Sequence, residues 1–336
     1  MSRVAVIGAG AWGTALAIVL GRKDRQEVQL WAYEHDVREA IRSTRTNTIF
    51  LPEQKIPASV QVTGDLREAL TGAETVVSAM PSQHCRNLFQ QMAEHLRPEM
   101  LIVSATKGLE ENTLLRMTEI IREVTGRKHQ EHRIGALSGP TFAAEVARGD
   151  PTAITIASTD SDLCSTVQTE FSDPAFRVYA NEDVIGVELG GALKNIIAIA
   201  AGVCHGLGLG HNSIAALITR GLAEISRLVV ACGGRAETMS GLAGLGDLVL
   251  TCTGALSRNR TVGVELGKGC KLPEILAGMH GMVAEGVFTT NAALQLAKRN
   301  GVEMPITEQM HAVLNEGKSP HQAIQTLMTR TSKREV

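Results

Sequence analysis

Apolar and polar residues follow two different patterns along the chain. In the first half, short aliphatic runs typical of buried strands alternate with segments in which apolar residues recur every three or four positions, as in amphipathic helices. The predicted strands are Val4–Ile7, Val28–Trp31, Val60–Thr63, Thr75–Ser78, Leu101–Ser104, Ile134–Leu137, Ala153–Ala157 and Phe176–Tyr179. The helices predicted between them are Ala11–Gly21, Asp36–Thr44, Gln83–His95, Thr113–Thr125 and Asp160–Phe171. Such alternation requires crossover connections, so we expect a mostly parallel sheet covered by helices.

The pattern changes after residue 182. Strand-like runs become scarce, and segments rich in Ala, Leu, Ile and Gly with helical spacing take over. The predicted helices are Val184–His205, Ser213–Cys232, Asn259–Lys268, Thr289–Asn300 and Ile306–Asn315. A chain of 336 residues is longer than one hydrophobic core usually serves. We therefore predict an α/β domain over residues 1–182 and an all-helical domain over residues 183–336, with a frayed end over residues 329–336.

A glycine-rich turn follows the first predicted strand. The segment Gly8-Ala-Gly10-Ala-Trp-Gly13 leads directly into a helix. The first glycine permits a tight turn, the second lets a pyrophosphate approach the backbone, and the third lets the helix pack on the strand. Free N–H groups at the helix N-terminus then hold the anion. The first domain is therefore predicted to be Rossmann-like and to bind NAD or NADP.

The sequence contains no clear selector between the two cofactors. An acidic residue is expected at the end of the second strand, but Tyr33 stands there, followed by Glu34. Tyr33 either stacks on an adenine or covers the sheet edge, and Glu34 either accepts from a ribose hydroxyl or is a solvated acid. Arg38, just beyond, either faces a 2′-phosphate or is an exposed helix residue. We predict that both cofactors are used, NADPH at least as well as NADH.

The composition limits the kinds of molecule that the protein can bind. Hydrophobic residues make up 44% and charged residues 20%, and the net charge is −2. No basic field is therefore available to hold nucleic acid or an anionic membrane, and an anionic ligand must be captured by a few placed groups. The longest apolar stretch, Ile196–Cys204, is too short to span a bilayer.

The cysteine spacing and the N-terminal sequence indicate whether the protein binds a metal and in which cellular compartment it is found. The six cysteines are scattered without a C-x-x-C pair, so neither a metal site nor a disulfide framework is expected. Free thiols indicate a reducing compartment. Because no targeting segment precedes the first strand, we expect a cytoplasmic protein.

Two lysines are candidates for chemistry. Lys194 lies in the helical segment Gly190-Gly-Ala-Leu-Lys-Asn-Ile-Ile-Ala198, among small and apolar residues. It either extends from a helix edge to water or is a partly desolvated acid/base group. Lys107 follows the strand Leu101–Ser104, at the carboxyl edge where α/β proteins place ligands, although a surface lysine would have the same sequence context. Ser138-Gly-Pro-Thr141-Phe-Ala143 is placed in the same way after another strand, although a turn that starts a helix explains this segment equally well.

Two later segments carry charge in unusual settings. Gly241-Leu-Ala-Gly-Leu-Gly246-Asp247 is too glycine-rich for a helix interior, and Asp247 is either an N-cap or a partner for a ligand or for the lysine ammonium. Ser257-Arg-Asn-Arg260 predicts a helix with a Ser N-cap and two arginines in its first turn. Cations there oppose the helix dipole, and a bound anion would relieve the conflict. We therefore expect a phosphate site.

Three segments together resemble the NAD(P)-dependent sn-glycerol-3-phosphate dehydrogenase family, in its bacterial branch. They are Gly191-Ala-Leu-Lys-Asn-Ile-Ile-Ala-Ile-Ala-Ala-Gly202, Ala243-Gly-Leu-Gly-Asp-Leu with Ser257-Arg-Asn-Arg260, and Val283-Ala-Glu-Gly286. Agreement runs from the glycine fingerprint to near the C-terminus. The resemblance implies a Rossmann-like domain, a helical domain and a substrate between them, with dihydroxyacetone phosphate and sn-glycerol 3-phosphate interconverted by hydride transfer. It also implies a homodimer and a supply of glycerol 3-phosphate for phospholipid synthesis.

The resemblance also implies roles for individual residues. Lys194 would be the acid/base, Lys107 would bind substrate and stabilise developing charge, and Asp247 would orient the site. The remaining implied substrate contacts are Gly139, Thr141, Ser257, Arg258 and Asn259. The implied cofactor contacts are Gly8, Gly10, Ala11, Trp12, Gly13, Tyr33, Lys107, Ala143, Arg258, Val283 and Glu285.

Two alternatives remain open at this point. A 6-phosphogluconate or hydroxyacid dehydrogenase also pairs a Rossmann domain with a helical domain and a lysine, but Asp247 followed by Ser257-Arg-Asn259 resembles the glycerol-3-phosphate branch. A non-catalytic NAD(P)-sensing module would need the fingerprint but has no use for Lys194 and Lys107.

Overall fold

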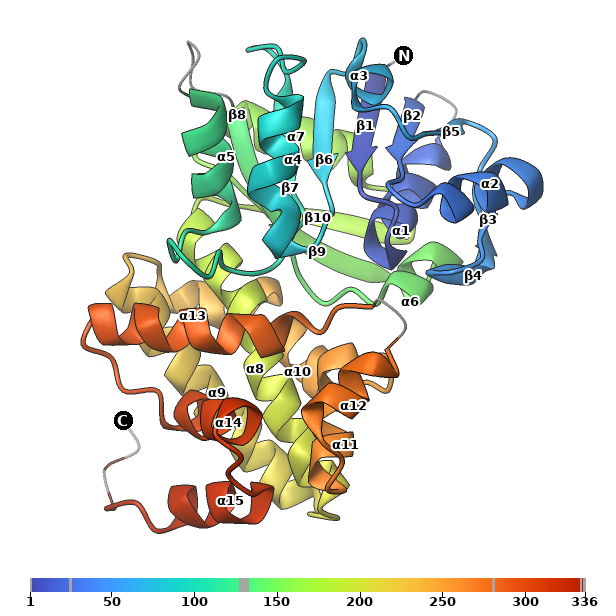
Figure 1. Ribbon diagram of the computed structural model, residues 1–336. Helices are drawn as coiled ribbons and strands as arrows, with labels where there is room; N and C mark the ends of the chain where they lie inside the picture. Colours follow the sequence, from blue (N-terminus) through green and yellow to red (C-terminus); the bar gives the residue numbers. More distant parts are fainter. Residues whose placement is uncertain (1, 24–25, 127–132, 280–281, 333, 335–336) are drawn as a thin grey trace. The chain divides into compact units, whose positions relative to one another are not determined.

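The computed structural model describes residues 2–23, 26–126, 133–279, 282–332 and 334 (Figure 1). The chain divides into two compact units, each with its own interior. The first contains residues 1–107 and 115–188, and the second contains residues 108–114 and 189–336. The chain therefore passes between the units near Lys107, Leu115 and Glu188.

An eight-stranded sheet forms the first unit. Its strands are β1 (Ser2–Ile7), β2 (Gln26–Trp31), β5 (Val60–Thr63), β6 (Thr75–Ser78), β7 (Leu101–Ser104), β8 (Arg133–Ser138), β9 (Thr152–Ala157) and β10 (Phe176–Asn181). They lie in the order β10-β9-β8-β7-β6-β1-β2-β5, and every neighbouring pair is parallel except β8 and β9. Each predicted strand falls within one of these, and the predicted fold class is confirmed.

Helices cover both faces of the sheet, as the alternation of buried residues along β1 requires. The helices of this unit are α1 (Ala11–Gly21), α2 (His35–Thr44), α3 (Leu66–Leu70), α4 (Cys85–Met92), α5 (Met117–Gly126), α6 (Ala143–Arg148) and α7 (Ser161–Phe171), with a short 3₁₀ helix η1 (Ser82–His84) before α4. Val4 and Val6 pack in a core with α1 and α7, whereas Ala5 and Ile7 pack in a second core with α3, α4 and α5.

Two predicted helices of this unit have wrong bounds, and one pair of strands was not predicted. The helix predicted from Thr113 begins only at Met117, because Leu114 has a left-handed backbone with φ of 64°. The helix predicted over Gln83–His95 is η1 followed by α4, which ends at Met92. A small antiparallel pair, β3 (Thr46–Asn47) and β4 (Leu51–Lys55), was not predicted, since two residues give no periodicity and Pro52 argues against a strand.

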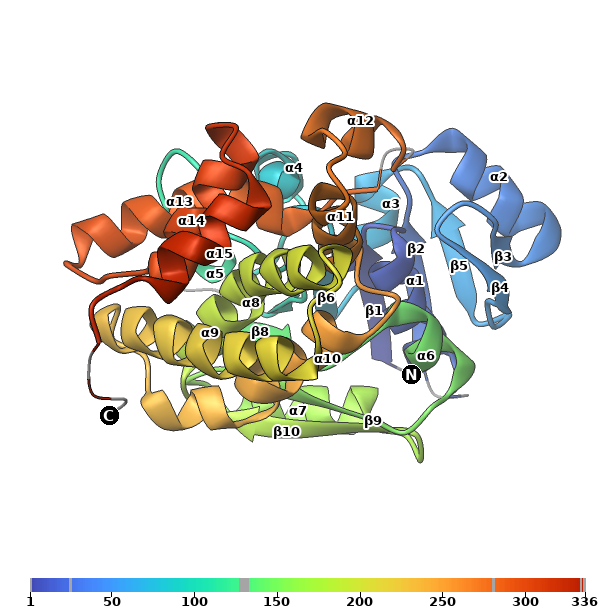
Figure 2. The same ribbon diagram turned by 90° about the horizontal axis from the view of Figure 1, so that it is seen from below.

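Among the described residues, the regular elements of the second unit are helices joined by turns and loops. Its α-helices are α8 (Val184–Gly206, which begins in the first unit), α9 (His211–Ala231), α10 (Asp247–Thr253), α11 (Arg258–Gly267), α12 (Leu272–Ala277), α13 (Glu285–Arg299), α14 (Pro305–Asn315) and α15 (Pro320–Met328). A 3₁₀ helix η2 (Ala236–Ser240) and a π-helix η3 (Leu242–Gly246) precede α10. Figure 2 shows α8 between α9 and α11.

Glycines allow α8 and α11 to touch through their main chains. A Cβ placed on Gly202 would lie 2.1 Å from the carbonyl oxygen of Arg260, and one on Gly263 would lie 2.0 Å from that of Ile199. The same holds one turn on, where a Cβ on Gly206 would lie 2.2 Å from the Val264 oxygen. No residue with a side chain fits these places, so the separation of the two helices is set by backbone contact.

Helix α8 is, among the described residues, long and apolar enough to cross a membrane by length and composition. The sequence analysis considered only the uninterrupted apolar stretch Ile196–Cys204 and so underestimated the length of the apolar helix. Glu188 and Lys194 interrupt the apolar sequence before that stretch. However, 89% of its most apolar window is buried inside the protein. Burial of that extent is what the core helix of a folded unit shows.

Candidate functional site

The glycine fingerprint forms a close turn after β1. Gly8 has φ of 115°, and a Cβ on it would lie 2.9 Å from the carbonyl carbon and oxygen of Ala79. A Cβ on Gly13 would lie 1.8 Å from the Gly8 oxygen, whereas one on Gly10 would meet nothing within 4 Å. Gly8 and Gly13 therefore serve the turn and its packing, and Gly10 leaves open space in front of the backbone.

The N-terminus of α1 has the properties of an anion site. Gly10 is the N-cap, no side chain caps the helix, and its first turn contains no acidic residue. The positive end of the helix dipole is therefore not balanced by the protein. The indole nitrogen of Trp12, in this first turn, is buried and has no acceptor among the described residues. A dinucleotide pyrophosphate fits this arrangement.

Asn47 holds the fingerprint turn from β3. Its buried side chain donates to the Ala9 carbonyl at 2.8 Å and to Thr14 Oγ1 at 2.9 Å, and accepts from the Phe50 main-chain nitrogen at 3.0 Å. Thr14 Oγ1 in turn donates to the same Ala9 carbonyl. Sequence reasoning missed Asn47, because nothing in the local pattern around residue 47 points to a turn 38 residues earlier.

The other predicted cofactor residues of this unit lie near strand ends. Tyr33 follows β2, is 77% exposed, and its ring centroid lies 6.2 Å from that of Trp31. Ala11 and Trp12 begin α1, and Ala143 begins α6; all three are partly buried and pack on the core behind α1. Their contacts with a cofactor remain predictions.

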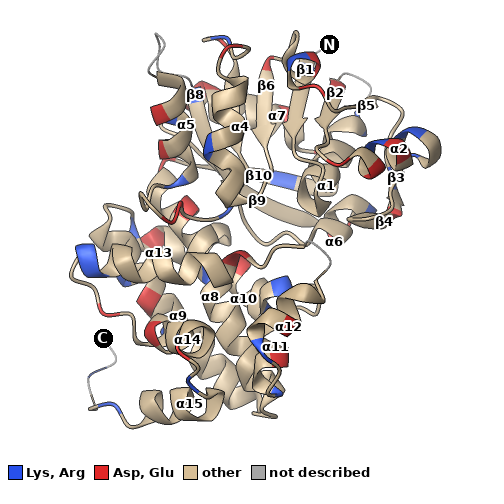
Figure 3. Cartoon of the chain, viewed as in Figure 1, with Lys and Arg blue, Asp and Glu red and all other residues tan. Residues whose placement is uncertain are grey.

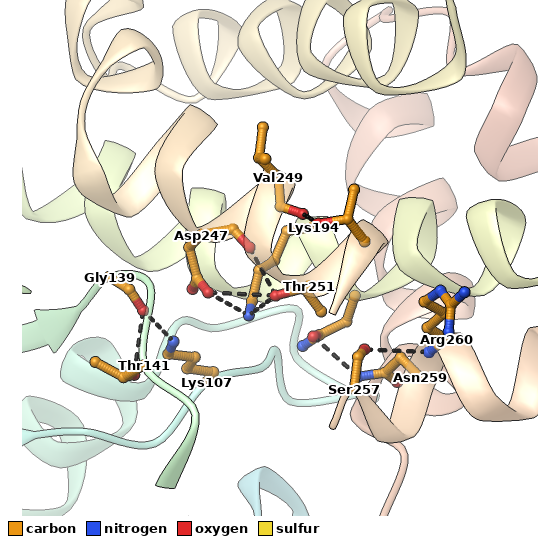
Figure 4. Close-up of polar contacts among 12 residues, drawn as sticks. Lys107, Gly139, Thr141, Lys194, Asp247, Val249, Thr251, Ser257, Asn259 and Arg260 are labelled. Carbon is orange, nitrogen blue, oxygen red and sulfur yellow. Dashed lines mark hydrogen bonds and ion pairs between the residues drawn. The ribbon is translucent and has the colours of Figure 1, made fainter. Parts of the chain in front are cut away.

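Lys107 and Thr141 meet at the carbonyl of Gly139 (Figure 4). Lys107 Nζ donates to this oxygen at 3.1 Å, and Thr141 Oγ1 donates to it at 3.2 Å. Lys107 follows β7 and Gly139 follows β8, which are neighbouring parallel strands, so their carboxyl ends share one edge of the sheet. The structure thus brings together three residues that the sequence placed after separate strands.

Lys194 in α8 is buried and forms an ion pair within the second unit. Its Nζ lies 2.6 Å from Asp247 Oδ1 and 2.6 Å from Thr251 Oγ1, and the side chains of Lys194 and Asp247 are only 8% and 1% exposed (Figure 4). The interpretation of Lys194 as a lysine extending to water is therefore wrong. A buried ammonium requires such a partner, because an isolated charge would be very costly in the interior.

A π-helix precedes Asp247, although the glycines of this segment argue against a helix. η3 occupies Leu242–Gly246 and continues directly into α10, so Asp247 is the first residue of α10 and Gly246 is its N-cap. A Cβ on Gly244 would lie 2.3 Å from the Met239 oxygen, so close backbone contact requires glycine here in spite of its low helix propensity. Of the alternatives for Asp247, a partner for the lysine ammonium is confirmed and an N-cap is wrong.

Two neighbours of this pair were not predicted. Thr251 Oγ1 accepts from Lys194 and donates to the Asp247 carbonyl at 2.6 Å, as the i, i+4 spacing within α10 allows. Cys252 lies in the same buried region, and burial raises the pKa of its thiol to about 12. Cys252 is therefore a neutral thiol and not a nucleophile. The threonine could be found from sequence only once the helical phase of α10 was known.

The N-terminus of α11 has the predicted cap. Ser257 is buried and its side chain accepts from the main-chain nitrogen of Arg260 at 3.2 Å (Figure 4). The first turn contains no acidic residue, and Arg258 in that turn is exposed to solvent. The Ser N-cap is confirmed, and binding of a phosphate by Ser257 and Arg258 remains a prediction.

Asn259 links three helices. Its amide donates to Asn195 Oδ1 in α8 at 2.9 Å, and its oxygen accepts from the Gly286 nitrogen in α13 at 2.9 Å. Gly286 leaves no room for a side chain, since a Cβ there would lie 2.7 Å from the Asn195 carbonyl oxygen. Val283, just before α13, and Glu285, its first residue, are both partly exposed beside this link. Asn195 is a site neighbour that the sequence did not identify.

Metal binding and a broad basic surface find no support in the part of the chain that is described. No group of three His, Cys, Asp or Glu side chains there could hold a metal ion. None of the six cysteines forms a disulfide. Figure 3 shows basic and acidic segments interspersed over the elements of both units. The candidate groups for an anionic ligand are therefore local.

Comparisons with known proteins agree on one family. The model described as NAD-dependent glycerol-3-phosphate dehydrogenase N-terminus matches residues 3–164, and the corresponding C-terminus model matches residues 183–325. Proteins named glycerol-3-phosphate dehydrogenase (NAD(P)+) from Koribacter versatilis and Acidobacterium capsulatum are 69% and 56% identical, each over 100% of this chain and over 99% and 100% of their own lengths. The crystal structure of glycerol-3-phosphate dehydrogenase from Coxiella burnetii matches with a TM-score of 0.92 and 41% identity, over 98% of this chain and 99% of that one.

Proposed function

This chain belongs to the NAD-dependent glycerol-3-phosphate dehydrogenase family, and we propose that it interconverts dihydroxyacetone phosphate and sn-glycerol 3-phosphate with Lys194 as acid/base. The observation that carries the proposal is the buried Lys194–Asp247 pair with Thr251. A module that only senses a nicotinamide cofactor has no use for a buried ammonium. A 6-phosphogluconate or hydroxyacid dehydrogenase is disfavoured by family matches that together span most of the chain.

The residues around the fingerprint fit a dinucleotide. We assign Gly8, Gly10 and Gly13 and the N-terminus of α1 to its pyrophosphate, because Gly10 leaves the backbone open and α1 has neither a side-chain cap nor an acidic residue in its first turn. When bound, the nicotinamide supplies or accepts the hydride. The further proposed cofactor contacts are Ala11, Trp12, Tyr33, Lys107, Ala143, Arg258, Val283 and Glu285. In this proposal, residues 1–182 bind the cofactor, and residues 183–336 supply the acid/base and the phosphate-binding groups.

Lys194 moves the proton in our proposal. In the direction of reduction its ammonium gives a proton to the C2 oxygen of dihydroxyacetone phosphate as that oxygen gains negative charge, and in oxidation the neutral amine takes the proton back. Asp247 and Thr251 accept hydrogen bonds from Nζ and fix its position, while the Asp247 carboxylate stabilises the charged form. We assign Lys107, Gly139 and Thr141 to substrate binding, with the Lys107 charge stabilising the developing alkoxide.

The phosphate end is assigned to the N-terminus of α11. The Ser257 main-chain nitrogen donates to the Gly254 carbonyl, and the Ser257 side chain accepts from the Arg260 nitrogen. We therefore assign the phosphate to the main-chain nitrogens of Arg258 and Asn259 and to the Arg258 guanidinium, with Ser257 as the cap that positions them. The Asn259 side chain already forms hydrogen bonds with Asn195 and Gly286. We therefore propose that Asn259 positions this turn, in addition to contacting the phosphate. We also propose a homodimer, a cytoplasmic location consistent with six cysteines outside disulfides, and a role in supplying phospholipid synthesis.

Consumption of reduced nicotinamide, followed by its absorbance, tests this function. Purified protein with dihydroxyacetone phosphate should oxidise NADPH and NADH, and 6-phosphogluconate or 2-hydroxyacids with the oxidised cofactors should give no comparable rate. Turnover only with the latter substrates would contradict the proposal, and cofactor binding without any turnover would favour the sensing alternative.

A further inference from the structure

Arg38 is held at the end of the second strand. It lies in α2, yet its Nη1 donates to the carbonyl oxygens of Ala32 at 2.8 Å and Tyr33 at 2.7 Å. These two residues directly follow β2. An arginine on a surface helix usually extends into solvent, whereas this one bends back to the main chain at the carboxyl edge of the sheet.

Gly64 makes room for the guanidinium on the neighbouring strand. It follows β5, which pairs with β2, and a Cβ on it would lie 2.8 Å from Arg38 Cζ, 2.9 Å from Nε and 3.0 Å from Nη1. The guanidinium therefore lies against the main chain of residue 64, and a side chain at that position would displace it. One nitrogen and one face of the group are thus fixed by the carboxyl ends of two adjacent strands.

The rest of the guanidinium has no protein partner among the described residues. No hydrogen bond from Arg38 Nε or Nη2 is formed there, and no carboxylate lies within ion-pair distance of it. The nearby acids lie against other groups: Glu39 pairs with Arg42 at 3.0 Å, and a carboxylate oxygen of Asp36 lies 3.7 Å from Nδ1 of the exposed His35. An unpaired charge held in a fixed position is suited to an external anion.

In dinucleotide-binding sheets, this position discriminates between cofactors. An acidic side chain after the second strand accepts from the ribose 2′-hydroxyl of NAD, and a nearby arginine accommodates the 2′-phosphate of NADP. Here the competing acid is Glu34, the N-cap of α2, whose exposed side chain makes no capping hydrogen bond. The positive group is fixed by the main chain and the negative group is not.

We propose that Arg38 binds the 2′-phosphate of NADP(H) and gives the enzyme a preference for NADPH over NADH. The proposal rests on the dinucleotide site of the proposed function and adds the residue that selects the cofactor. Because Nη1 is already bonded to the Ala32 and Tyr33 carbonyls, the guanidinium loses little freedom when the phosphate binds through Nε and Nη2.

Binding of cofactor fragments tests the proposal without turnover. Calorimetry with 2′,5′-ADP, which contains the 2′-phosphate, and with 5′-ADP, which lacks it, compares wild type with Arg38→Gln and Arg42→Ala. Gln keeps an amide donor for the two carbonyls and removes the charge, and Arg42, one turn further along α2, controls for loss of a surface cation. We expect Arg38→Gln to raise the Kd of 2′,5′-ADP by about 10- to 100-fold, the size of one lost charge-assisted bond. The ratio of kcat/KM with NADPH to that with NADH should fall by a similar factor, and Arg42→Ala should leave the ratio unchanged.

Three results would overturn the inference. They are a wild-type preference for NADH, an unchanged 2′,5′-ADP affinity in Arg38→Gln, or a change in the cofactor ratio that follows Glu34→Gln instead. Arg38→Lys, which keeps a cation without the fork, serves as a second variant if Arg38→Gln does not fold. The proposed function fails separately, if wild type shows no turnover of dihydroxyacetone phosphate with either cofactor.

Discussion

The two units offer ligands different kinds of group. In the first unit, the candidate positions at the sheet edge are mostly main chain: the turn at Gly8 and Gly10, the N-terminus of α1 and the Gly139 carbonyl. In the second unit, the central group is a buried side-chain network around Lys194 and Asp247. Main-chain N–H and carbonyl groups are uncharged and need no ion-pair partner. They suit the binding of the pyrophosphate, the part of the cofactor that does not change in the reaction. A buried amine with a carboxylate partner can exchange a proton, so chemistry is expected to depend on the helical unit and binding on the sheet edge.

The Lys194→Ala variant should show the largest effect and is the strongest test of this contrast. Loss of an acid/base group typically lowers kcat by about 10²-fold or more. The variant also leaves Asp247 buried without its cation, so we expect the free energy of unfolding to fall by about 3–5 kcal/mol. Steady-state kinetics below the lowered Tm, with cofactor Kd measured in parallel, separate the two effects.

The affinity of Lys194→Ala for the cofactor should barely change if the first unit binds the cofactor and the second unit supplies the chemistry. Lys271→Ala, which removes an exposed lysine before α12, is the matched control. Near-normal turnover in Lys194→Ala would remove the distinction between a catalytic helical unit and a binding sheet edge.

Arg258→Ala should have the next largest effect. The loss of charge-assisted bonds to phosphate is expected to cost about 1.5–3 kcal/mol, which raises the KM for dihydroxyacetone phosphate by about 10- to 150-fold. The Tm of the ligand-free protein should stay the same or rise slightly, since a cation in the first turn of α11 opposes the helix dipole. Lys268→Ala, at the other end of α11, should leave the KM unchanged and lower the Tm slightly, since a cation there complements the helix dipole and pairs with Glu265. An unaltered KM would move the phosphate to Lys107 and the Gly139–Thr141 turn, and so to the sheet edge.

Asn47→Ala tests whether the main-chain site depends on one side chain. The variant removes two donated bonds and one accepted bond that hold the fingerprint turn, and leaves buried groups unpaired. We expect a loss of about 1–3 kcal/mol in the free energy of unfolding and weaker dinucleotide binding. Denaturant titration and cofactor binding measure the two, and Asn87→Ala, at an exposed position in α4, is the control. A normal cofactor Kd in a destabilised Asn47→Ala would show that the turn keeps its form through glycine alone.

The smallest effect is expected at an ion pair of the first unit that is open to solvent. Arg133 donates to Asp160, at 2.9 Å for one of its two bonds, and this bonding lowers the pKa of the Asp160 carboxyl to about 2. A carboxyl whose pKa is lower in the folded state stabilises the protein above its unfolded pKa, and this stabilisation is lost as the pH falls through the folded pKa. Because the side chains are 39% and 28% exposed, we expect only about 1 kcal/mol at pH 7.

Asp160→Asn measures this contribution, because Asn retains the capping of α7. The difference in free energy of unfolding from wild type should fall to about half between pH 7 and pH 3, which lies between the two pKa values. A difference independent of pH would show that the pair contributes through geometry and not through charge.

The sequence predicts the first unit better than the second. The reason is the same for the fold and for the candidate sites: local sequence patterns mark the features of the first unit, whereas packing between distant residues sets those of the second. Strands buried on both faces are continuous apolar runs, and a main-chain site is marked by its own glycines, so β1 and the turn at Gly8 are both visible locally. The pairing of Lys194 with Asp247 joins residues 53 apart, and local patterns only allowed it as one alternative. Thr251 and Asn195 gave no signal, since their partners are set by how helices pack.

Glycine misled the prediction where packing overrides propensity. The segment over residues 241–246 was excluded from helix because of its glycines, yet η3 forms there. Contact of Gly244 with the Met239 backbone requires the absence of a side chain, and the gain in packing exceeds the loss in helix propensity. Composition alone cannot tell a glycine that breaks a helix from one that lets two backbones touch.

The backbone contact between α8 and α11 has a consequence for slow motions of the enzyme. Lys194 lies on α8 and Arg258 on α11, and the glycine contacts join these helices without side chains that could change rotamer. Local opening of one helix would therefore expose the other, and amide hydrogens of both should exchange with solvent slowly and as one cooperative group. Helix α12, which buries no residue, and α15, which buries only Ala323, should exchange much faster. The spacing between the proposed proton donor and the proposed phosphate-binding turn would then persist through the fluctuations that open α12 and α15.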